Sequence, residues 1–170
     1  KNYKVDERIP RNVLMEYFLS MIVKYVRGLV LLNKMYVFLG YHVIIKCKRK
    51  IIAGKWLNVG DYVQIDALSL DGLILGRSVS IGKYTTIDCT GSFVFLGKGM
   101  TVGDNVGLGT HSFYGCAGGI NIGDDVIIGN YVSMHSENHN FTQRDIKIRL
   151  QGVSHKGIVI GNDCWIGAKA

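Results

Sequence analysis

The sequence is poor in proline, in paired cysteines and in uninterrupted apolar runs, and each shortage excludes a class of structure. Proline occurs once and glycine 22 times in 170 residues, which favours many tight corners between short elements. The four cysteines form no C-x-x-C pair, so we expect neither a zinc site nor a disulfide framework, but free buried thiols in a reducing compartment. Residues 10–46 are apolar, yet Lys24, Arg27 and Lys34 interrupt them, and no stretch reaches the ~20 residues of a membrane span.

The net positive charge comes from the N-terminal part of the chain. The net charge is +7, but residues 1–55 hold 12 Lys/Arg against 3 Asp/Glu, whereas the remainder holds 8 against 10. A nucleic-acid-binding protein would carry its basic surface on the folded domain itself, so no nucleic-acid partner is expected. The first ten residues are polar and show no secretory signal. We therefore expect a cytoplasmic protein that contacts the inner face of the cell membrane peripherally, if at all, through residues 1–50.

Residues 11–28 are predicted to form an amphipathic helix. Asn12 is a candidate N-cap and Gly28 a candidate stop. Two roles remain open for this segment: it caps the open end of the fold that follows, or it lies on an anionic membrane surface. Residues 43–50 are expected to hold a first strand that ends in a basic cluster. The apolar positions of the helix follow i, i+3/i+4 spacing and are Leu14, Phe18, Met21, Ile22 and Tyr25.

A six-residue repeat organises residues 51–170. An aliphatic residue followed by glycine recurs through this part of the chain, and such a short period is typical of a parallel β-helix. The aliphatic side chains are expected to point inward, while stretches 88–101 and 109–121 keep the period less well and should hold longer corners. The repeated pairs are Val59-Gly60, Leu75-Gly76, Ile81-Gly82, Val102-Gly103, Leu108-Gly109, Ile122-Gly123, Ile128-Gly129, Ile160-Gly161 and Ile166-Gly167.

One long loop, residues 135–157, interrupts the repeat after Met134. Long loops in compact folds are usually functional or disordered. This one carries His, Glu, Asn and Arg, and a histidine can act as a base near neutral pH. The interruption is therefore the predicted place of the chemistry.

Three motifs in and after this loop resemble a known family. S-E-N-H-N-F begins at Ser136, I-R-L-Q-G at Ile148, and I-G-N-D-C-W-I-G-A at Ile160. Together they are similar to the hexapeptide-repeat acyltransferases, and more narrowly to the maltose and galactoside O-acetyltransferases and the polysaccharide O-acetyltransferases. The resemblance covers roughly residues 55–170. It implies an all-β, left-handed parallel β-helix that assembles as a homotrimer, with active sites between neighbouring chains.

The activity that the resemblance implies is an acyl-CoA-dependent O-acyltransferase. Acetyl-CoA would be the co-substrate, no metal would be needed, and a sugar or lipid-linked glycan of surface-polysaccharide biosynthesis would be the acceptor. His139 matches the family's catalytic histidine, a general base, and Glu137 is a candidate partner by its nearness in sequence. Trp165, Gly167 and Ala168 match the acetyl-CoA site, with the Ala168 N–H stabilising the oxyanion.

Acceptor contacts are assigned to His111, His135, Asn138 and Gln151, although relatives carry an acceptor-binding Asn where this chain has Thr110-His111-Ser112. His155 is expected to be solvent-exposed and His42 structural. Relatives usually continue for further coils beyond the W-I-G-A motif, so we expect this chain to be truncated at its C-terminus and to bind acetyl-CoA weakly as it stands.

Other functions remain open. A γ-type carbonic anhydrase would use three histidines on zinc, and His111, His135 and His139 are the candidates, but that enzyme needs no such loop. A β-helix scaffold at the membrane is a non-enzymatic alternative. An ice-binding solenoid would need flat threonine rows, which Thr85, Thr86 and Thr90 do not form in register.

Overall fold

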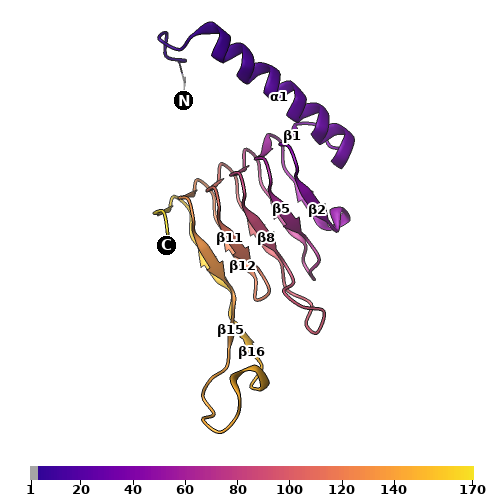
Figure 1. Ribbon diagram of the computed structural model, residues 1–170, viewed down its shortest axis with the longest axis vertical. Coiled ribbons are helices and arrows are strands. Elements are labelled where there is room, and N and C mark those ends of the chain that lie inside the picture. Colours follow the sequence, from indigo (N-terminus) through magenta and orange to yellow (C-terminus); the bar gives the residue numbers. More distant parts are fainter. Residues whose placement is uncertain (1–3) are drawn as a thin grey trace.

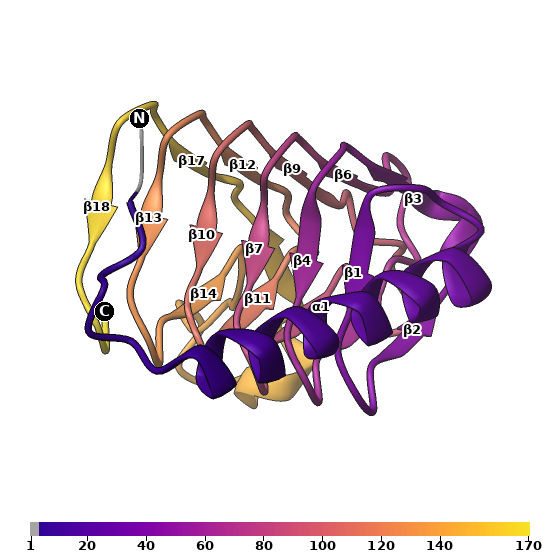
Figure 2. The ribbon, with the colours of Figure 1, turned by 90° about the horizontal axis from the view of Figure 1, so that it is seen from above.

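The fold is a left-handed parallel β-helix preceded by one long helix, as predicted; the computed structural model describes residues 4–170. The chain winds so that each turn contributes one short strand to each of three parallel sheets (Figure 2). The first sheet holds β1 (Val37–Leu39), β4 (Leu57–Val59), β7 (Ser80–Ile81), β10 (Gly107–Leu108), β13 (Ile127–Ile128) and β18 (Trp165–Ile166). The second holds β2 (Ile44–Lys46), β5 (Gln64–Asp66), β8 (Thr86–Asp88), β11 (Phe113–Gly115) and β14 (Ser133–His135). The third holds β3 (Ile51–Ala53), β6 (Leu73–Leu75), β9 (Met100–Val102), β12 (Ile120–Ile122) and β17 (Ile158–Ile160).

The repeated aliphatic residues form the core that the six-residue period predicts. They stack in register through the turns: Val59 is opposite Ile81, and Leu75 is opposite Val102. From Val59 to Met134 these side chains are buried, and Ile160 and Ile166 are partly buried against them. Since each inward residue contacts its counterparts above and below, one continuous apolar column supports all three sheets.

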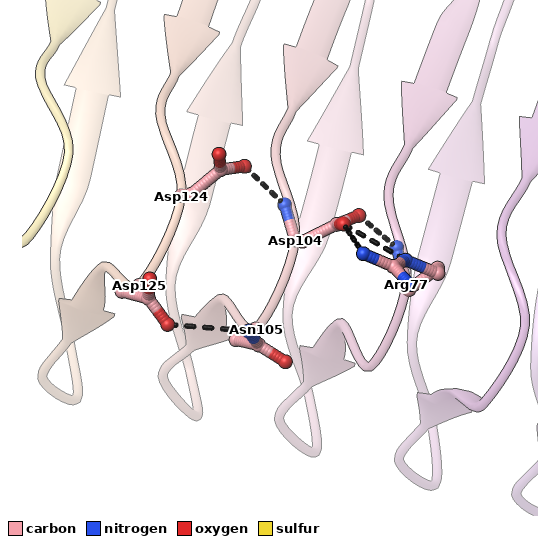
Figure 3. A network of polar contacts seen from close by, with 5 residues as sticks. All are labelled: Arg77, Asp104, Asn105, Asp124 and Asp125. Carbon is pink, nitrogen blue, oxygen red and sulfur yellow. Dashed lines mark hydrogen bonds and ion pairs between the residues drawn. The ribbon is translucent and has the colours of Figure 1, made fainter.

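The corner between the third and first sheets is held by a ladder of side chains from successive turns (Figure 3). The Asp104 carboxylate accepts from the backbone N–H of Arg77 at 2.6 Å, and Asp124 accepts from that of Asp104 at 2.7 Å. Asn162 accepts from the N–H of Asp124 at 2.9 Å. A glycine precedes each of these backbone donors because any Cβ there would collide with the next turn; at Gly76 it would lie 2.5 Å from a carbonyl.

Aromatic rings stack along the corner between the first and second sheets. His42, Tyr62, Tyr84, His111 and Tyr131 follow one another with ring centroids 4.8 to 5.0 Å apart. All five have positive φ, a left-handed conformation that costs non-glycine residues energy. Ring stacking on both sides offsets that cost. His42 is therefore structural, as expected.

Among the described residues, the connections between strands vary in length at one corner of the β-helix, the edge between the second and third sheets. The connections there run over 47–50, 67–72, 89–99, 116–119 and 136–157, whereas those between the first and second sheets keep one length. The longer corner expected in 88–101 is confirmed, but 109–121 contains only a short corner. We call this variable corner the loop edge.

The N-terminal helix differs from its prediction at both ends. Helix α1 spans Arg11–Leu32 and begins after Pro10, whose fixed φ suits that position, so the predicted Asn12 cap is wrong. It continues through Gly28, where a Cβ would lie 1.9 Å from the Val37 carbonyl oxygen. Gly28 therefore serves close packing on β1, and the helix ends at Asn33 in the left-handed conformation.

Helix α1 lies lengthwise beside the turns and does not cover their end (Figures 1 and 2). Its C-terminal half contacts β1: the Arg27 Nε donates to the Gly40 carbonyl at 3.0 Å, and the Tyr25 ring lies 5.7 Å from that of Phe38. The first turn already begins at Val37, since β1 pairs with β4, so the boundary expected at residue 51 falls inside it. Among the described residues, no helix has the length and apolarity to cross a bilayer.

Candidate functional site

The interrupting loop is an antiparallel hairpin at the loop edge, and it projects from the β-helix (Figure 1). Its strands are β15 (Glu137–His139) and β16 (Val153–His155), and the loop between them contains a short 3₁₀ turn, Ile148–Leu150. Ser136 fastens its base: the buried hydroxyl donates to the Gly115 carbonyl at 2.7 Å and accepts from the Gly118 N–H at 2.8 Å. The hairpin thus starts from a fixed point on the neighbouring turn.

His139 is exposed at the end of β15, opposite Val153. It lines two hollows of about 380 and 460 Å³, shared with His135, Glu137 and Asn138. Among residues 4–170, no side chain or carbonyl makes a hydrogen bond to its imidazole. A small molecule can therefore reach its ring from either side of the strand.

Glu137 faces a different histidine from the one expected. Its carboxylate lies 3.7 Å from Nδ1 of His155, its cross-strand neighbour. The predicted exposure of His155 is wrong, because only 19% of its side chain is accessible and the Phe95 ring stacks on it at 4.0 Å. Within the described chain, Nδ1 of His155 is buried without a hydrogen-bond partner. Glu137 and His155 thus face each other across the two hairpin strands without a hydrogen bond between them.

His135 and Asn138 lie in the same hollow as His139. The His135 ring is 3.0 Å from the Ser133 hydroxyl and stacks on Phe113 at 5.1 Å. Asn138 is exposed beside it, opposite Ser154. Both residues predicted as acceptor contacts are therefore positioned at the hollow.

The Gln151 side chain makes its hydrogen bonds within the hairpin loop. Its amide nitrogen donates to the carbonyls of Gln143 at 2.8 Å and Ile146 at 2.7 Å, and its oxygen accepts from the Gln143 N–H at 3.0 Å. These bonds close the hairpin loop on itself. The structure therefore gives Gln151 a role in shaping the loop.

The remaining predicted site residues lie away from His139. His111 is in the aromatic stack between Tyr84 and Tyr131, at the opposite corner of the second sheet. Trp165 is 80% exposed on the first sheet, in register with Ile127. Gly167 and Ala168 follow it, and a Cβ at Gly167 would meet nothing within 4 Å. Within one chain, the predicted base and the predicted acetyl-CoA residues do not share a cavity.

The cysteines offer no nucleophile in this region. Hydrogen bonding with Cys89 and burial raise the pKa of the Cys116 thiol. Cys89 and Cys116 are buried free thiols as expected, but Cys47 is exposed. In the part of the chain that the structure describes, no three His, Cys, Asp or Glu side chains could hold one metal ion; His111, His135 and His139 are not gathered within the chain as the carbonic anhydrase alternative would require.

Comparison with known proteins points to acetyl transfer. The chain is similar to the probable acetyltransferase Rv3034c of Mycobacterium tuberculosis, with 32% identity over 121 residues. The match covers 70% of this chain but 38% of the mycobacterial protein, so the chain spans well under half of that relative's length. No protein-family model matches, and no solved structure matches significantly. The similarity supports a relation to acetyltransferases.

Proposed function

We propose that this protein transfers an acetyl group from acetyl-CoA to a sugar hydroxyl, with His139 as the general base. The observation that carries the proposal is the exposed His139 imidazole in a polar hollow on a hairpin fastened at Ser136. The similarity to an acetyltransferase supports the reaction class. A sugar or lipid-linked glycan of surface-polysaccharide biosynthesis is the proposed acceptor, because His135 and Asn138 offer hydrogen-bonding groups beside the base.

In this mechanism, Nε2 of His139 removes the acceptor hydroxyl proton while the hydroxyl oxygen attacks the thioester carbonyl. The resulting oxyanion accepts a hydrogen bond from the Ala168 N–H. The carbon–sulfur bond then breaks, the ester remains on the sugar, and the imidazolium returns its proton to the CoA thiolate. Neither a metal nor a redox step is required.

The separation of the two residue groups supports an assembly. His139 lies at the loop edge, while Trp165 and Ala168 lie at and beside the first sheet, so one chain alone does not bring them together. In the proposed homotrimer, the hairpin of one copy faces the Trp165 region of its neighbour. Exposed Ile127, beside Trp165, offers an apolar wall for acetyl-CoA.

The direct test is thiol release from acetyl-CoA with a panel of sugars and nucleotide-sugars. Because general-base catalysis contributes about 10²–10⁴-fold, we expect His139→Ala to lower kcat by about that factor with an unchanged melting temperature. His42→Ala is the control, since His42 lies at the far end of the aromatic stack. Equal rates for wild type and His139→Ala would remove His139 from the mechanism, and absence of acceptor-dependent release would favour the scaffold alternative.

A second experiment tests the composite site. His139→Ala and Gly167→Trp should each be inactive, the latter because the indole fills the proposed acetyl-CoA site while meeting open space in the single chain. Co-expressed, the two variants should recover roughly a quarter of wild-type activity, since random mixing leaves that share of interfaces intact. Failure to recover activity would contradict a site shared between neighbouring copies.

A further inference from the structure

The outer face of helix α1 is an apolar stripe that no residue within 4–170 covers. Residues spaced three and four apart share a helix face, and Met21, Lys24, Tyr25 and Gly28 form the face toward the turns, where Gly28 is buried. On the opposite side, Phe18 is 59% and Val30 74% exposed. We call this face the outer stripe; its members are Met15, Phe18, Leu19, Ile22, Val26, Leu29 and Val30.

The outer stripe runs along most of helix α1. It follows the i, i+3, i+4, i+7 spacing of a helix that buries one face, and from Met15 to Val30 it extends over roughly 22 Å at 1.5 Å per residue. Helix α1 lies along the outside of the turns (Figures 1 and 2), and the side chains of the stripe are exposed along it. A flat, apolar surface can cover it in a single contact.

Basic residues adjoin both ends of the outer stripe. Arg11 begins the helix and Lys34 follows it, and the exposed 3₁₀ turn Lys48–Lys50 lies beside the helix's C-terminal end, where Lys48 Nζ donates to the Leu31 carbonyl at 3.1 Å. Lys55 adds to this group and is exposed. Residues 1–55, which include the stripe, hold 12 Lys/Arg against 3 Asp/Glu, whereas residues 56–170 hold 8 against 10.

We propose that α1 binds an anionic lipid bilayer surface through the outer stripe, lying in the plane of the interface with these basic residues on the headgroups. An apolar helix face beside Lys and Arg is the combination that such surfaces attract. Pairing of the outer stripe with that of a second copy would instead bring two strongly basic segments together, and charge repulsion opposes such pairing. The inference is independent of the proposed acetyl transfer.

The test is flotation of the full chain with vesicles of phosphatidylcholine alone and with 30% phosphatidylglycerol. We expect binding to the anionic vesicles, weakened at least tenfold by Leu19→Gln/Val26→Gln/Val30→Gln and by 0.5 M salt. Glutamine keeps the helix favourable. The matched control is Leu70→Gln/Val159→Gln, which removes exposed apolar side chains from the β-helix and should bind as the wild type does.

Two results would overturn this inference. Vesicle binding that is equal for the wild type and the glutamine triple variant would show that the stripe is not the contact. Absence of vesicle binding, combined with self-association that the triple variant abolishes in sedimentation, would assign the stripe to a second copy of the chain. Sugar acetylation is measured in solution for the same variants, so that a loss of vesicle binding can be distinguished from a loss of acetylation.

Discussion

The turns of the β-helix and the hairpin at residues 136–157 hold their residues in place in different ways. In the turns, each interior strand pairs with a parallel strand on both sides, and a buried column of side chains joins successive turns. In the hairpin, β15 and β16 pair only with each other, and His139 and most of the loop are exposed. Disturbing one turn therefore affects its neighbours, whereas disturbing the hairpin should remain local. The proposed base, His139, therefore lies on the part that can change without unwinding the fold.

The largest effect is expected from shortening a side chain in the core. Leu75→Ala removes a side chain that is 2% exposed and stacked between Ala53 and Val102, and we expect the free energy of unfolding to fall by about 2–5 kcal/mol. Leu150→Ala in the hairpin loop, where the side chain is 67% exposed, should change it by less than about 0.5 kcal/mol. Urea unfolding followed by circular dichroism measures both. Similar losses would mean that the hairpin is part of the cooperative core.

A second variant should loosen the hairpin alone. Gln151→Ala removes three hydrogen bonds that close the loop, so the free energy of opening residues 141–152 should fall by about 1–3 kcal/mol. Faster amide exchange confined to those residues is the expected result, with global unfolding unchanged. Gln143→Ala is the matched control, because Gln143 takes part through its backbone. Faster amide exchange that extends into β14 and β17 would show that the hairpin does not open independently of the turns.

The aromatic stack gives a smaller and more distributed effect. Tyr84→Ala removes contacts to Tyr62 at 5.0 Å and His111 at 4.9 Å. Each stacked pair contributes about 0.5–1.5 kcal/mol, and because Tyr84 is 51% exposed we expect the lower part of that range, a total loss of about 1–2 kcal/mol. Tyr84→Gly should be less destabilised than Tyr84→Ala because φ is 58° there and glycine adopts it without strain. Thermal melts compare the two variants. Equal melting temperatures would show that the corner stores no backbone strain.

The smallest expected effect is the acid sensitivity of the corner ladder. The Arg77 backbone N–H and guanidinium lower the pKa of Asp104. At the corner between the first and second sheets, burial acts to raise the pKa of Asp61, but the Lys83 ammonium and the Tyr41 N–H outweigh it and lower that pKa. A carboxyl whose pKa is lower in the folded state stabilises above its unfolded pKa of about 3.9, and this contribution is lost as the pH falls through the folded value.

Melting temperatures between pH 5 and pH 2 should therefore decline less in Asp104→Asn than in the wild type. Asparagine keeps the acceptor for the Arg77 N–H, as Asn130 and Asn162 do at their own corners. Asp71→Asn is the control, because the described residues give the Asp71 side chain no ion pair. An identical pH slope in all three proteins would exclude the ladder as a source of acid sensitivity.

The residues of the core could be predicted from sequence because a six-residue period repeats the same local environment. Val59, Ile81 and Ile128 are buried where the period places them. The end of α1 could not be predicted in this way, since Gly28 is required by the approach of Val37, a tertiary contact. The partner of Glu137 depends on the antiparallel register of β15 and β16, and on Phe95 from another corner. Sequence order alone identifies the loop that carries His139 but does not show which side chains meet there.

The variable loop edge has a consequence for how such a protein can diversify. Since the strands on either side of a corner are aligned by neighbours above and below, inserting residues at 67–72, 89–99 or 136–157 leaves the register of the sheets unchanged. New segments can therefore be added at one corner, one turn at a time, and long segments can meet across a turn with a short corner, as Phe95 and His155 do on either side of 116–119. The loop edge works as a row of equivalent attachment points, so new specificities can arise by lengthening a corner while the stack beneath it is inherited intact.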